Sequence, residues 1–337
     1  MPEDQIARLS ARYVRFADEE ARGRSPLYEA LARSLAADRE VLAFLTTLPA
    51  AKQQPNLLLA TMRLHFGVLD GWNRFREALL ANTPAIRMAI LSRSTQTNEP
   101  ARCATLLPVL AQLPQPLALL EVGASAGLCL LPDHYGYDFG RISLQPVIRV
   151  APAPLFRCDI DAGTPVPTAI PRIVWRAGLD IDPPDIADPE RRRWLDLLVW
   201  PEQTHRLEAL RLSLQIADAV RPQVVRGDLR NETFEQLCRQ APTEATLVVF
   251  HTAVLGYVSD SAERQAFASR ALQAADVWIS NEAPRVFPES ARTAHAAGPT
   301  GNFLMSVNGT AVAWADPHGE SLQWIGGDCP AIGRRRP

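Results

Sequence analysis

Residues 116–128 constrain the fold of this chain more than any other stretch. The apolar residues 117–122 have the length of a strand, with an acid, Glu121, near its end. A loop of small residues, 123–127, follows, and residues 128–131 can open a helix. Such a strand–loop–helix unit binds ligands well, because backbone N–H groups and the positive helix end face outward there. Gly123 and Gly127 would let a ligand lie against the backbone.

Three interpretations of this loop compete. It can form a pocket for a nucleotide-type ligand at the carboxyl edge of a parallel sheet. It can be a serine nucleophile elbow, because residues 123–127 also fit the pattern G-x-S-x-G around Ser125. Or its small residues only let a helix pack closely on a strand. The remainder of the chain has to decide among them.

Composition excludes several classes of protein. The 337 residues, 47% hydrophobic and 21% charged, suit a soluble globular chain of one large or two ordinary domains. A formal net charge of -2 gives no general attraction to nucleic acid or to an anionic membrane. The five cysteines are widely spaced without a C-x-x-C pair, so no disulfide framework or metal site is expected. A cytoplasmic location is the expectation, since a signal pattern and a membrane-length apolar run are both missing.

The N-terminal third is expected to be helical. From about residue 5 to residue 113, apolar side chains recur at helical spacing between prolines. Ser25 followed by Pro26 resembles a helix N-cap with proline at the first helical position. We therefore expect a helical subdomain or cap over residues 1–113, lying over the ligand edge. The alternative is packing elsewhere on the sheet, including a contact in a homo-oligomer.

Strands alternating with helices from 114 to 330 predict a doubly wound, mostly parallel α/β sheet. Expected strands lie at 117–122, 172–183, 223–228, 245–250 and 277–279, followed by a hairpin of 302–307 and 310–314 around Asn308-Gly309. Expected helices lie at 188–220, broken at Pro201, at 233–239 and at 262–275. The proline-rich segment 132–172 is interpreted as an inserted hairpin, or as a surface excursion without a ligand role.

Four consecutive expected strands end in polar residues: Glu121, Asp180, Asp228 and His251. Helix capping could explain one or two of them. The carboxyl ends of parallel strands meet at one edge, where ligands bind in such sheets. The four residues together with the glycine loop therefore favour a ligand site at that edge.

These motifs resemble those of class I S-adenosylmethionine-dependent methyltransferases. Residues 121–127 look like the first motif of that family, with Ser125 in place of a middle glycine. Residues 178–183 resemble the second-strand motif, whose acid binds the ribose hydroxyls, and Gly227-Asp228 resembles the acid at the adenine amino group. Residues 247–258 resemble the segment that faces the reacting centre, and the hairpin resembles the reversed seventh strand of that fold.

The resemblance implies a seven-stranded Rossmann-like fold over about 116–326, which binds S-adenosylmethionine and methylates a small molecule. The cofactor-binding residues that it implies are Glu121, Gly123, Ser125, Gly127, Asp180, Asp228 and Leu229. The implied catalytic residues are His251 and Tyr257, with Glu282 and Arg285 as further candidates on the substrate side. The segment 132–172 departs from the family pattern. More narrowly, the loop, residues 194–203 and residues 315–319 resemble a bacterial family known as domain of unknown function 2332.

Two alternative functions stay open. One is a non-catalytic nucleotide-binding or regulatory protein on the same fold, because no acceptor motif is identifiable. The other is a serine hydrolase, since Ser125, Asp228 and either His251 or His318 occur in the right chain order. Against the hydrolase, a long helical region precedes the loop where that fold would place strands. A dinucleotide dehydrogenase is disfavoured because Leu128 follows Gly127 and breaks its glycine spacing.

Overall fold

The computed structural model describes residues 2–326 of the chain, so Cys329 and the arginines near the C-terminus lie outside the described residues. The chain divides into two compact units. A helical unit comprises Met1–Thr97 and Ala187–Glu208, and a sheet unit comprises Asn98–Ile186 and Ala209–Pro337. The boundary expected at 113/114 therefore differs from the observed one at 97/98. The segment 187–208 was expected in the second domain and belongs to the first unit.

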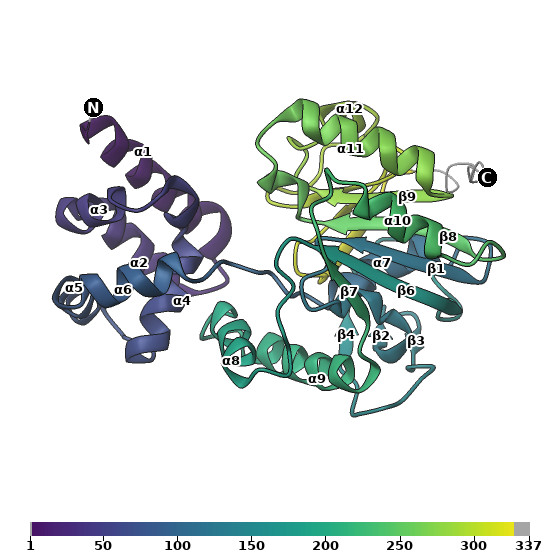
Figure 1. Cartoon of the computed structure of the whole chain (residues 1–337), viewed down its shortest axis with the longest axis horizontal. Helices are drawn as coiled ribbons and strands as arrows, with labels where there is room; N and C mark the ends of the chain where they lie inside the picture. Colours follow the sequence, from purple (N-terminus) through teal and green to yellow (C-terminus); the bar gives the residue numbers. More distant parts are fainter. Residues whose placement is uncertain (1, 327–337) are drawn as a thin grey trace. The chain divides into compact units, whose positions relative to one another are not determined.

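The first unit is helical, as its apolar spacing predicted (Figure 1). Its helices are α1 (Pro2–Arg15), α2 (Pro26–Ala37), α3 (Arg39–Thr46), α4 (Pro55–Phe66), α5 (Trp72–Ala81), α6 (Thr83–Leu91) and α8 (Pro189–Leu198), with a π-helical turn, Phe16–Ala21, and a 3₁₀ turn, Ala50–Lys52. The N-cap prediction is confirmed: the Ser25 hydroxyl accepts the Tyr28 N–H at 3.1 Å, and Pro26 opens α2.

Two tryptophans explain why the segment 187–208 joins the helical unit. Trp194 and Trp200 are buried in the same apolar core as the N-terminal helices. The Trp194 indole donates to the Ser94 carbonyl at 2.9 Å, and the Trp200 indole donates to Asn56 Oδ1 at 2.9 Å. Glu202 accepts hydrogen bonds from the Ser25 hydroxyl and the Leu27 N–H. The segment is therefore bound to this unit by both apolar and polar contacts.

The sheet unit is mixed α/β with a large, mostly parallel sheet. Nine strands of the described chain form it, in the order β5-β12-β11-β10-β9-β8-β1-β6-β7 (Figure 1). These are β1 (Leu117–Val122), β5 (Asp159–Ile160), β6 (Ile173–Asp180), β7 (Gln223–Arg226), β8 (Thr246–Thr252), β9 (Val277–Glu282), β10 (Phe303–Val307), β11 (Thr310–Ala315) and β12 (Ser321–Trp324). The five neighbours β7, β6, β1, β8 and β9 are all parallel.

One expectation about the sheet is corrected. The sheet has nine strands instead of seven, because β12 and the two-residue β5 extend its far edge. The predicted hairpin is present: β10 runs antiparallel to both β9 and β11, and Asn308 and Gly309, at φ 50° and 85°, join β10 to β11.

The segment 132–172 is only partly a surface excursion. It supplies β5 and a small sheet of β2 (Gly136–Asp138), β3 (Ser143–Leu144) and β4 (Leu155–Arg157). Tyr135 and Tyr137 are fully buried, and their hydroxyls donate to the carbonyls of Leu128 and Pro132 at 2.8 and 2.7 Å. The insertion is therefore anchored to the residues that follow the glycine loop.

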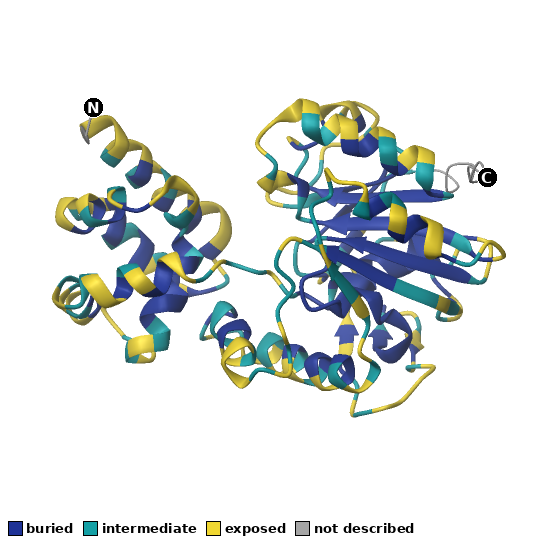
Figure 2. Cartoon of the chain, in the orientation of Figure 1, coloured by how far each residue is buried: buried dark blue, intermediate teal, exposed yellow. Residues whose placement is uncertain are grey.

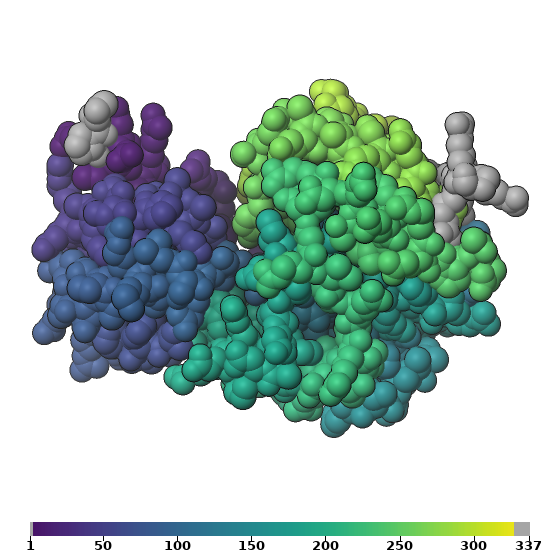
Figure 3. All heavy atoms as spheres, in the orientation of Figure 1, coloured from purple at the N-terminus to yellow at the C-terminus, as the bar shows by residue number. Residues whose placement is uncertain are grey.

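Helices cover the sheet, whose central strands β1, β8 and β9 are buried and dark blue in Figure 2, whereas β6 and β7 are partly exposed. The covering helices are α7 (Arg102–Leu110), α9 (Thr204–Val220), α10 (Thr233–Gln240) and α11 (Ser261–Ala274), while α12 (Pro288–Arg292) packs against the hairpin of β10 and β11. On one face Phe234 of α10 and Phe267 of α11 share an apolar core with Leu247 and Val249 of β8. These helices form the green outer surface in Figure 3. Within residues 2–326, no helix has the length and apolar character needed to cross a membrane.

We expect Gly178→Ala to destabilise the sheet unit. A Cβ on Gly178 in β6 would lie 2.5 Å from the Cβ of Ala124 and 3.2 Å from Val224. Relief requires β6 and the loop after β1 to move apart, which costs about 1–3 kcal/mol for an overpacked core. Urea denaturation measures the loss. The matched control is Gly163→Ala, whose Cβ would meet only an atom at 3.9 Å; equal effects from both variants would contradict the packing argument.

Candidate functional site

The strand order brings the ends of β1 and β8 together at the edge where such sheets bind ligands. After β1 and the segment 132–172, the chain forms β6 and β7 on one side of β1, and later β8 and β9 on the other. Ligands bind beyond the carboxyl ends at such a reversal of strand order. The loops that follow β1 and β8 also contain non-glycine residues with positive φ, Ser125 at 48° and Ala253 at 57°. Backbone strain of this kind occurs preferentially at functional sites.

The N–H groups of the loop after β1 do not face outward as expected. Those of Gly123 and Ala124 both donate to the Leu179 carbonyl, and that of Gly127 donates to the Ala124 carbonyl. The N–H groups of Ser125 and Ala126 donate to side-chain oxygens. The following residues, Leu128–Leu130, form one 3₁₀ turn instead of a helix. The prediction that free N–H groups face outward here, at the N-terminus of a helix, is therefore wrong.

The loop glycines are explained by packing within the chain. A Cβ on Gly123 would lie 2.3 Å from Val254 Cγ2, in the loop after β8. A Cβ on Gly127 would lie 3.0 Å from Val224 Cγ2 and 3.1 Å from Pro222. The space that we expected for a ligand beside Gly123 is therefore taken by Val254, as the close-packing interpretation requires.

Asp180, at the end of β6, lies beside this loop. Its Oδ2 accepts the Ser125 N–H at 2.8 Å, and its Oδ1 accepts the Asp182 N–H at 2.8 Å. Asn98 holds the other side of the loop: its amide donates to the Ser125 hydroxyl at 3.0 Å, and its Oδ1 accepts the Ala126 N–H at 3.2 Å. Ser125 and Asp180 are thus brought together, with Asn98 as a partner that the sequence did not single out.

Glu121 is enclosed beneath the loop. Its carboxyl is buried, and Oε2 has no hydrogen-bond partner within residues 2–326. Burial, followed by the nearby Cys129, raises the pKa of Glu121 well above its usual value, whereas the charge of Arg102 opposes the rise. The protonated form of Glu121 is therefore favoured, in contrast to the carboxylate that the cofactor role assumes.

His251 and Glu282 form a buried pair on the face covered by α10 and α11. His251 Nδ1 lies 2.7 Å from Glu282 Oε1, which also accepts the N–H groups of Val254 and Leu255. The imidazole packs against the rings of Phe267, Trp278 and Phe287. A carboxylate at Nδ1 fixes the tautomer that leaves Nε2 as an acceptor. Nε2 is buried and has no partner among the described residues.

A second polar group lies on the opposite face of the sheet, since alternate residues of a strand point to opposite sides. Arg102 of α7 is buried and donates to the carbonyl and hydroxyl of Thr252, at 3.0 and 3.2 Å, and to the Pro317 carbonyl at 2.8 Å. Asn281 of β9, opposite Thr252, is fully buried, and both ends of its amide lack a hydrogen bond within the described chain.

Asn98, Arg102 and Asn281 were not predicted from the sequence. Arg102 and Asn98 lie in the region that was assigned to the helical cap. Asn281 follows the expected strand 277–279, which continues to Glu282 in the structure. The polar sequence Ser280-Asn281-Glu282 was the available signal, because it ends an apolar strand in the same way as the four strand-end residues identified earlier.

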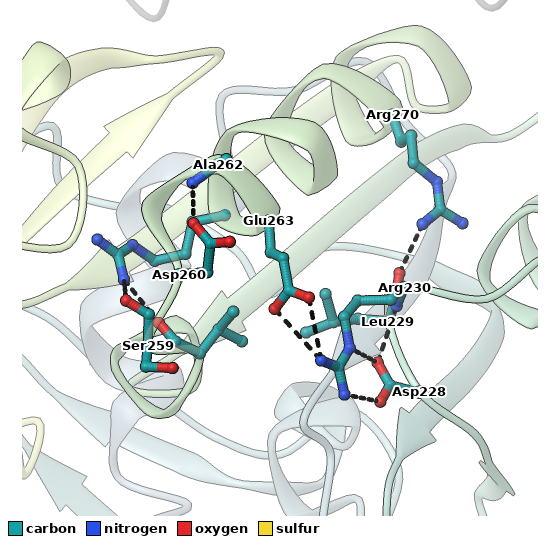
Figure 4. Close-up of polar contacts among 10 residues, drawn as sticks. Asp228, Leu229, Arg230, Ser259, Asp260, Ala262, Glu263 and Arg270 are labelled. Atoms are coloured by element: carbon teal, nitrogen blue, oxygen red, sulfur yellow. Dashed lines mark hydrogen bonds and ion pairs between the residues drawn. The ribbon is translucent and has the colours of Figure 1, made fainter.

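Asp228 and Leu229 lie in the loop after β7, where both already have partners within the chain (Figure 4). The Asp228 carboxylate accepts hydrogen bonds from the Arg230 guanidinium at 2.9 and 2.6 Å, and this contact lowers the pKa of Asp228. Arg230 also pairs with Glu263 of α11 at 3.2 Å. The Leu229 carbonyl accepts a hydrogen bond from Arg270 at 2.9 Å.

The remaining candidates do not assemble into a triad. The Ser125 hydroxyl is bonded to Asn98, and no histidine of the described chain is hydrogen-bonded to it. Tyr257 is 67% exposed, and Arg285 is exposed too. His318 Nδ1 lies 3.3 Å from Glu99 Oε2. Over residues 2–326 no group of three or more His, Cys, Asp or Glu side chains is arranged to hold a metal ion.

We expect Glu121→Gln to stabilise the protein increasingly as pH rises above the ordinary carboxyl pKa of about 4.3. The folded state holds this proton more tightly than the unfolded state, so wild-type stability falls as pH rises toward the folded pKa. Glutamine is neutral throughout and escapes this loss. Thermal denaturation over a pH series measures the difference. Asp182→Asn, at a half-exposed position, is the control. A difference in melting temperature between Glu121→Gln and wild type that does not grow with pH would contradict the raised pKa of Glu121.

Comparison with known proteins places the whole of this architecture in one family. No curated protein of known function matches the chain. A family model described as "Uncharacterized protein conserved in bacteria (DUF2332)" matches residues 10–324, which span both units. The resemblance noted in the loop, in residues 194–203 and in residues 315–319 is thereby confirmed at the level of the family. The chain belongs to the DUF2332 family of uncharacterized bacterial proteins.

Proposed function

We propose that the sheet unit binds S-adenosylmethionine at the ends of β1 and β6 and transfers its methyl group to a small-molecule acceptor. The observation that carries the proposal is the pattern of hydrogen-bonding groups at this edge. The loop N–H groups are used within the chain, whereas carboxyl and amide groups converge there. A ligand for such a site donates hydrogen bonds and lacks phosphate, which needs N–H donors or cations.

S-adenosylmethionine has this character. Its ribose hydroxyls and its amino groups are donors, and it carries a sulfonium. Asp180 accepts one N–H on each oxygen and keeps a second lone pair on each for a ribose diol. Glu121 Oε2 and the Asn281 amide, unpartnered within residues 2–326, are further groups that a ligand could satisfy.

Binding in this way requires local movement. Val254 lies over Gly123, so the loop after β8 has to shift before a ligand reaches Glu121. For the adenine amino group to contact Asp228, the carboxylate has to accept a hydrogen bond from it in addition to those from Arg230. A methyl transferase depends mainly on the alignment of nucleophile and methyl group in a dry site. His251, held by Glu282, is the candidate base, and Tyr257 is the candidate on the acceptor side.

The second candidate function is ligand binding without turnover. The enclosure of both His251 and Glu121 favours it, because neither group reaches solvent in this conformation. Methyl-labelled S-adenosylmethionine incubated with a bacterial small-molecule extract separates the two. Transfer of label that Asp180→Asn abolishes supports catalysis, whereas ligand binding without transfer supports the regulatory role.

We expect Asp180→Asn to weaken S-adenosylmethionine binding by about 1–3 kcal/mol, the range for a lost hydrogen bond to a charged group. Asparagine retains one oxygen for the Ser125 N–H, so the loop stays supported. Isothermal titration calorimetry with S-adenosylmethionine and S-adenosylhomocysteine measures the change. Asp182→Asn, two residues along, is the matched control and should bind as the wild type does. Equal affinity of Asp180→Asn, Asp180→Ala and wild type would remove Asp180 from the site; wild type that binds neither ligand would overturn the proposal.

The serine hydrolase alternative makes the opposite chemical forecast for Ser125. We expect no covalent adduct on Ser125 from a fluorophosphonate probe, because its hydroxyl is bonded to Asn98 instead of a histidine. We also expect Ser125→Gly to retain ligand binding, since glycine adopts the positive φ of this position readily. Mass spectrometry of the treated protein decides between the two. A stoichiometric adduct on Ser125 would restore the hydrolase and assign His251 or His318 as its base.

A further inference from the structure

The helical unit contains a hollow of its own that the proposed function does not use. It is open to solvent, and its empty space, counted together with the solvent at its mouth, is about 230 Å³. Its lining comes from α2, α4, α5, the α4–α5 connection and Pro201, and is mostly apolar, with Leu31, Leu59, Met62 and Phe75 among the contributing side chains. Two lining residues are polar, Tyr28 and Arg63, and they give the hollow its chemical character.

Arg63 presents an unoccupied edge of its guanidinium. Its Nη1 donates to the carbonyls of Leu197, at 2.9 Å, and Val199. Its Nε is buried and has no hydrogen-bond partner within residues 2–326. Nη2 makes no hydrogen bond or ion pair in this part of the chain either. Nε and Nη2 are the two parallel donors that bind a carboxylate in bidentate fashion.

Tyr28 adds a third donor beside that edge. Its side chain is 3% exposed, and its hydroxyl has no hydrogen-bond partner among the described residues. Burial raises the pKa of Tyr28 to about 12, and the neighbouring Arg63 charge acts against the rise. The hydroxyl therefore stays protonated at neutral pH and lies close to the guanidinium. A buried hydroxyl without a partner is costly, so its persistence calls for an acceptor from outside the chain.

We propose that this hollow binds a small apolar monocarboxylate, with the carboxylate on the Nε–Nη2 edge of Arg63 and the Tyr28 hydroxyl. These three donors, and a guanidinium that forms no ion pair with the described residues, match the two oxygens and single charge of a carboxylate. The apolar lining matches a short hydrocarbon tail, whose burial is favourable. Because Arg63 Nε and the Tyr28 hydroxyl are buried, the lining side chains have to move apart to admit the carboxylate. Glu202, the nearby acid, is already bonded to the Ser25 hydroxyl and the Leu27 N–H at the start of α2.

The charge and the tail can each be tested with a matched compound. Calorimetry with the full-length protein compares hexanoate with hexanamide, which has the same shape without the charge, and with acetate, which lacks the tail. We expect hexanoate to bind at least about tenfold more tightly than either, since each loses one of the two contributions. Equal binding of hexanoate and hexanamide, or of hexanoate and acetate, would overturn the proposal, as would a failure of hexanoate to bind.

Two variants locate the binding groups. Tyr28→Phe removes only a hydroxyl that has no partner within the described chain, so its melting temperature should equal or exceed that of wild type, while hexanoate affinity falls about tenfold. Arg63→Lys keeps the charge but loses the bidentate edge, and should weaken binding at least as much. Arg39→Gln, which breaks an exposed pair with Glu3, is the control and should bind normally. Wild-type affinity in both Tyr28→Phe and Arg63→Lys would overturn the site.

Discussion

The close approach of two backbones at the ends of β1 and β6 is the constraint on which the sheet unit depends. Gly178 presents only a hydrogen where Ala124 comes near, so the loop after β1 can lie flat on the end of β6. That contact lets Leu179 and Asp180 bind the loop N–H groups. Val254 packs against Gly123, so the loop after β8 lies against the loop after β1. The arrangement of the strand ends thus follows from small side chains at a few positions.

The same packing decides the chemical character of the edge. A glycine-rich loop usually offers N–H groups, but here they are consumed by oxygens of the chain itself. Asp180 keeps acceptor capacity, and within residues 2–326 Glu121 Oε2, the Asn281 amide and His251 Nε2 have no hydrogen-bond partner. Glu282 accepts three hydrogen bonds on one oxygen, and so couples the imidazole to the backbone of the loop after β8. Any shift of Val254 therefore also disturbs the hydrogen bonds around His251.

Sequence patterns predicted the elements that have long apolar runs or strong turn signals. The first five parallel strands, the Asn308-Gly309 hairpin and the helical N-terminal region are of this kind. The edge strand β5 was missed because two residues are too short for a periodicity. Its neighbour β12 was missed because Leu322 and Trp324 form no continuous apolar run, unlike Val224 and Val225 of the equally short β7. The segment 187–208 was misassigned because its tryptophans reveal burial but not which core they enter.

The candidate site was predictable only in outline. Strand ends located Asp180 beside the loop, since parallel strands share an edge. The sequence could not reveal that Gly123 faces Val254, or that Asp228 is held by Arg230, because both depend on contacts between distant loops. The burial that raises the pKa of Glu121 is likewise a property of the packed structure.

The return of residues 187–208 to the helical unit has a consequence for how the chain becomes folded in the cell. Domains generally fold as units while the ribosome extends the chain from its N-terminus. Here the first unit lacks Trp194, Trp200 and Glu202 until β1 and β6 have already been synthesised. The N-terminal helices must therefore wait, with part of their core exposed, for a segment encoded beyond the glycine loop. Their assembly is thus complete only after residues 187–208 have been synthesised, although helices α1 to α6 precede that segment.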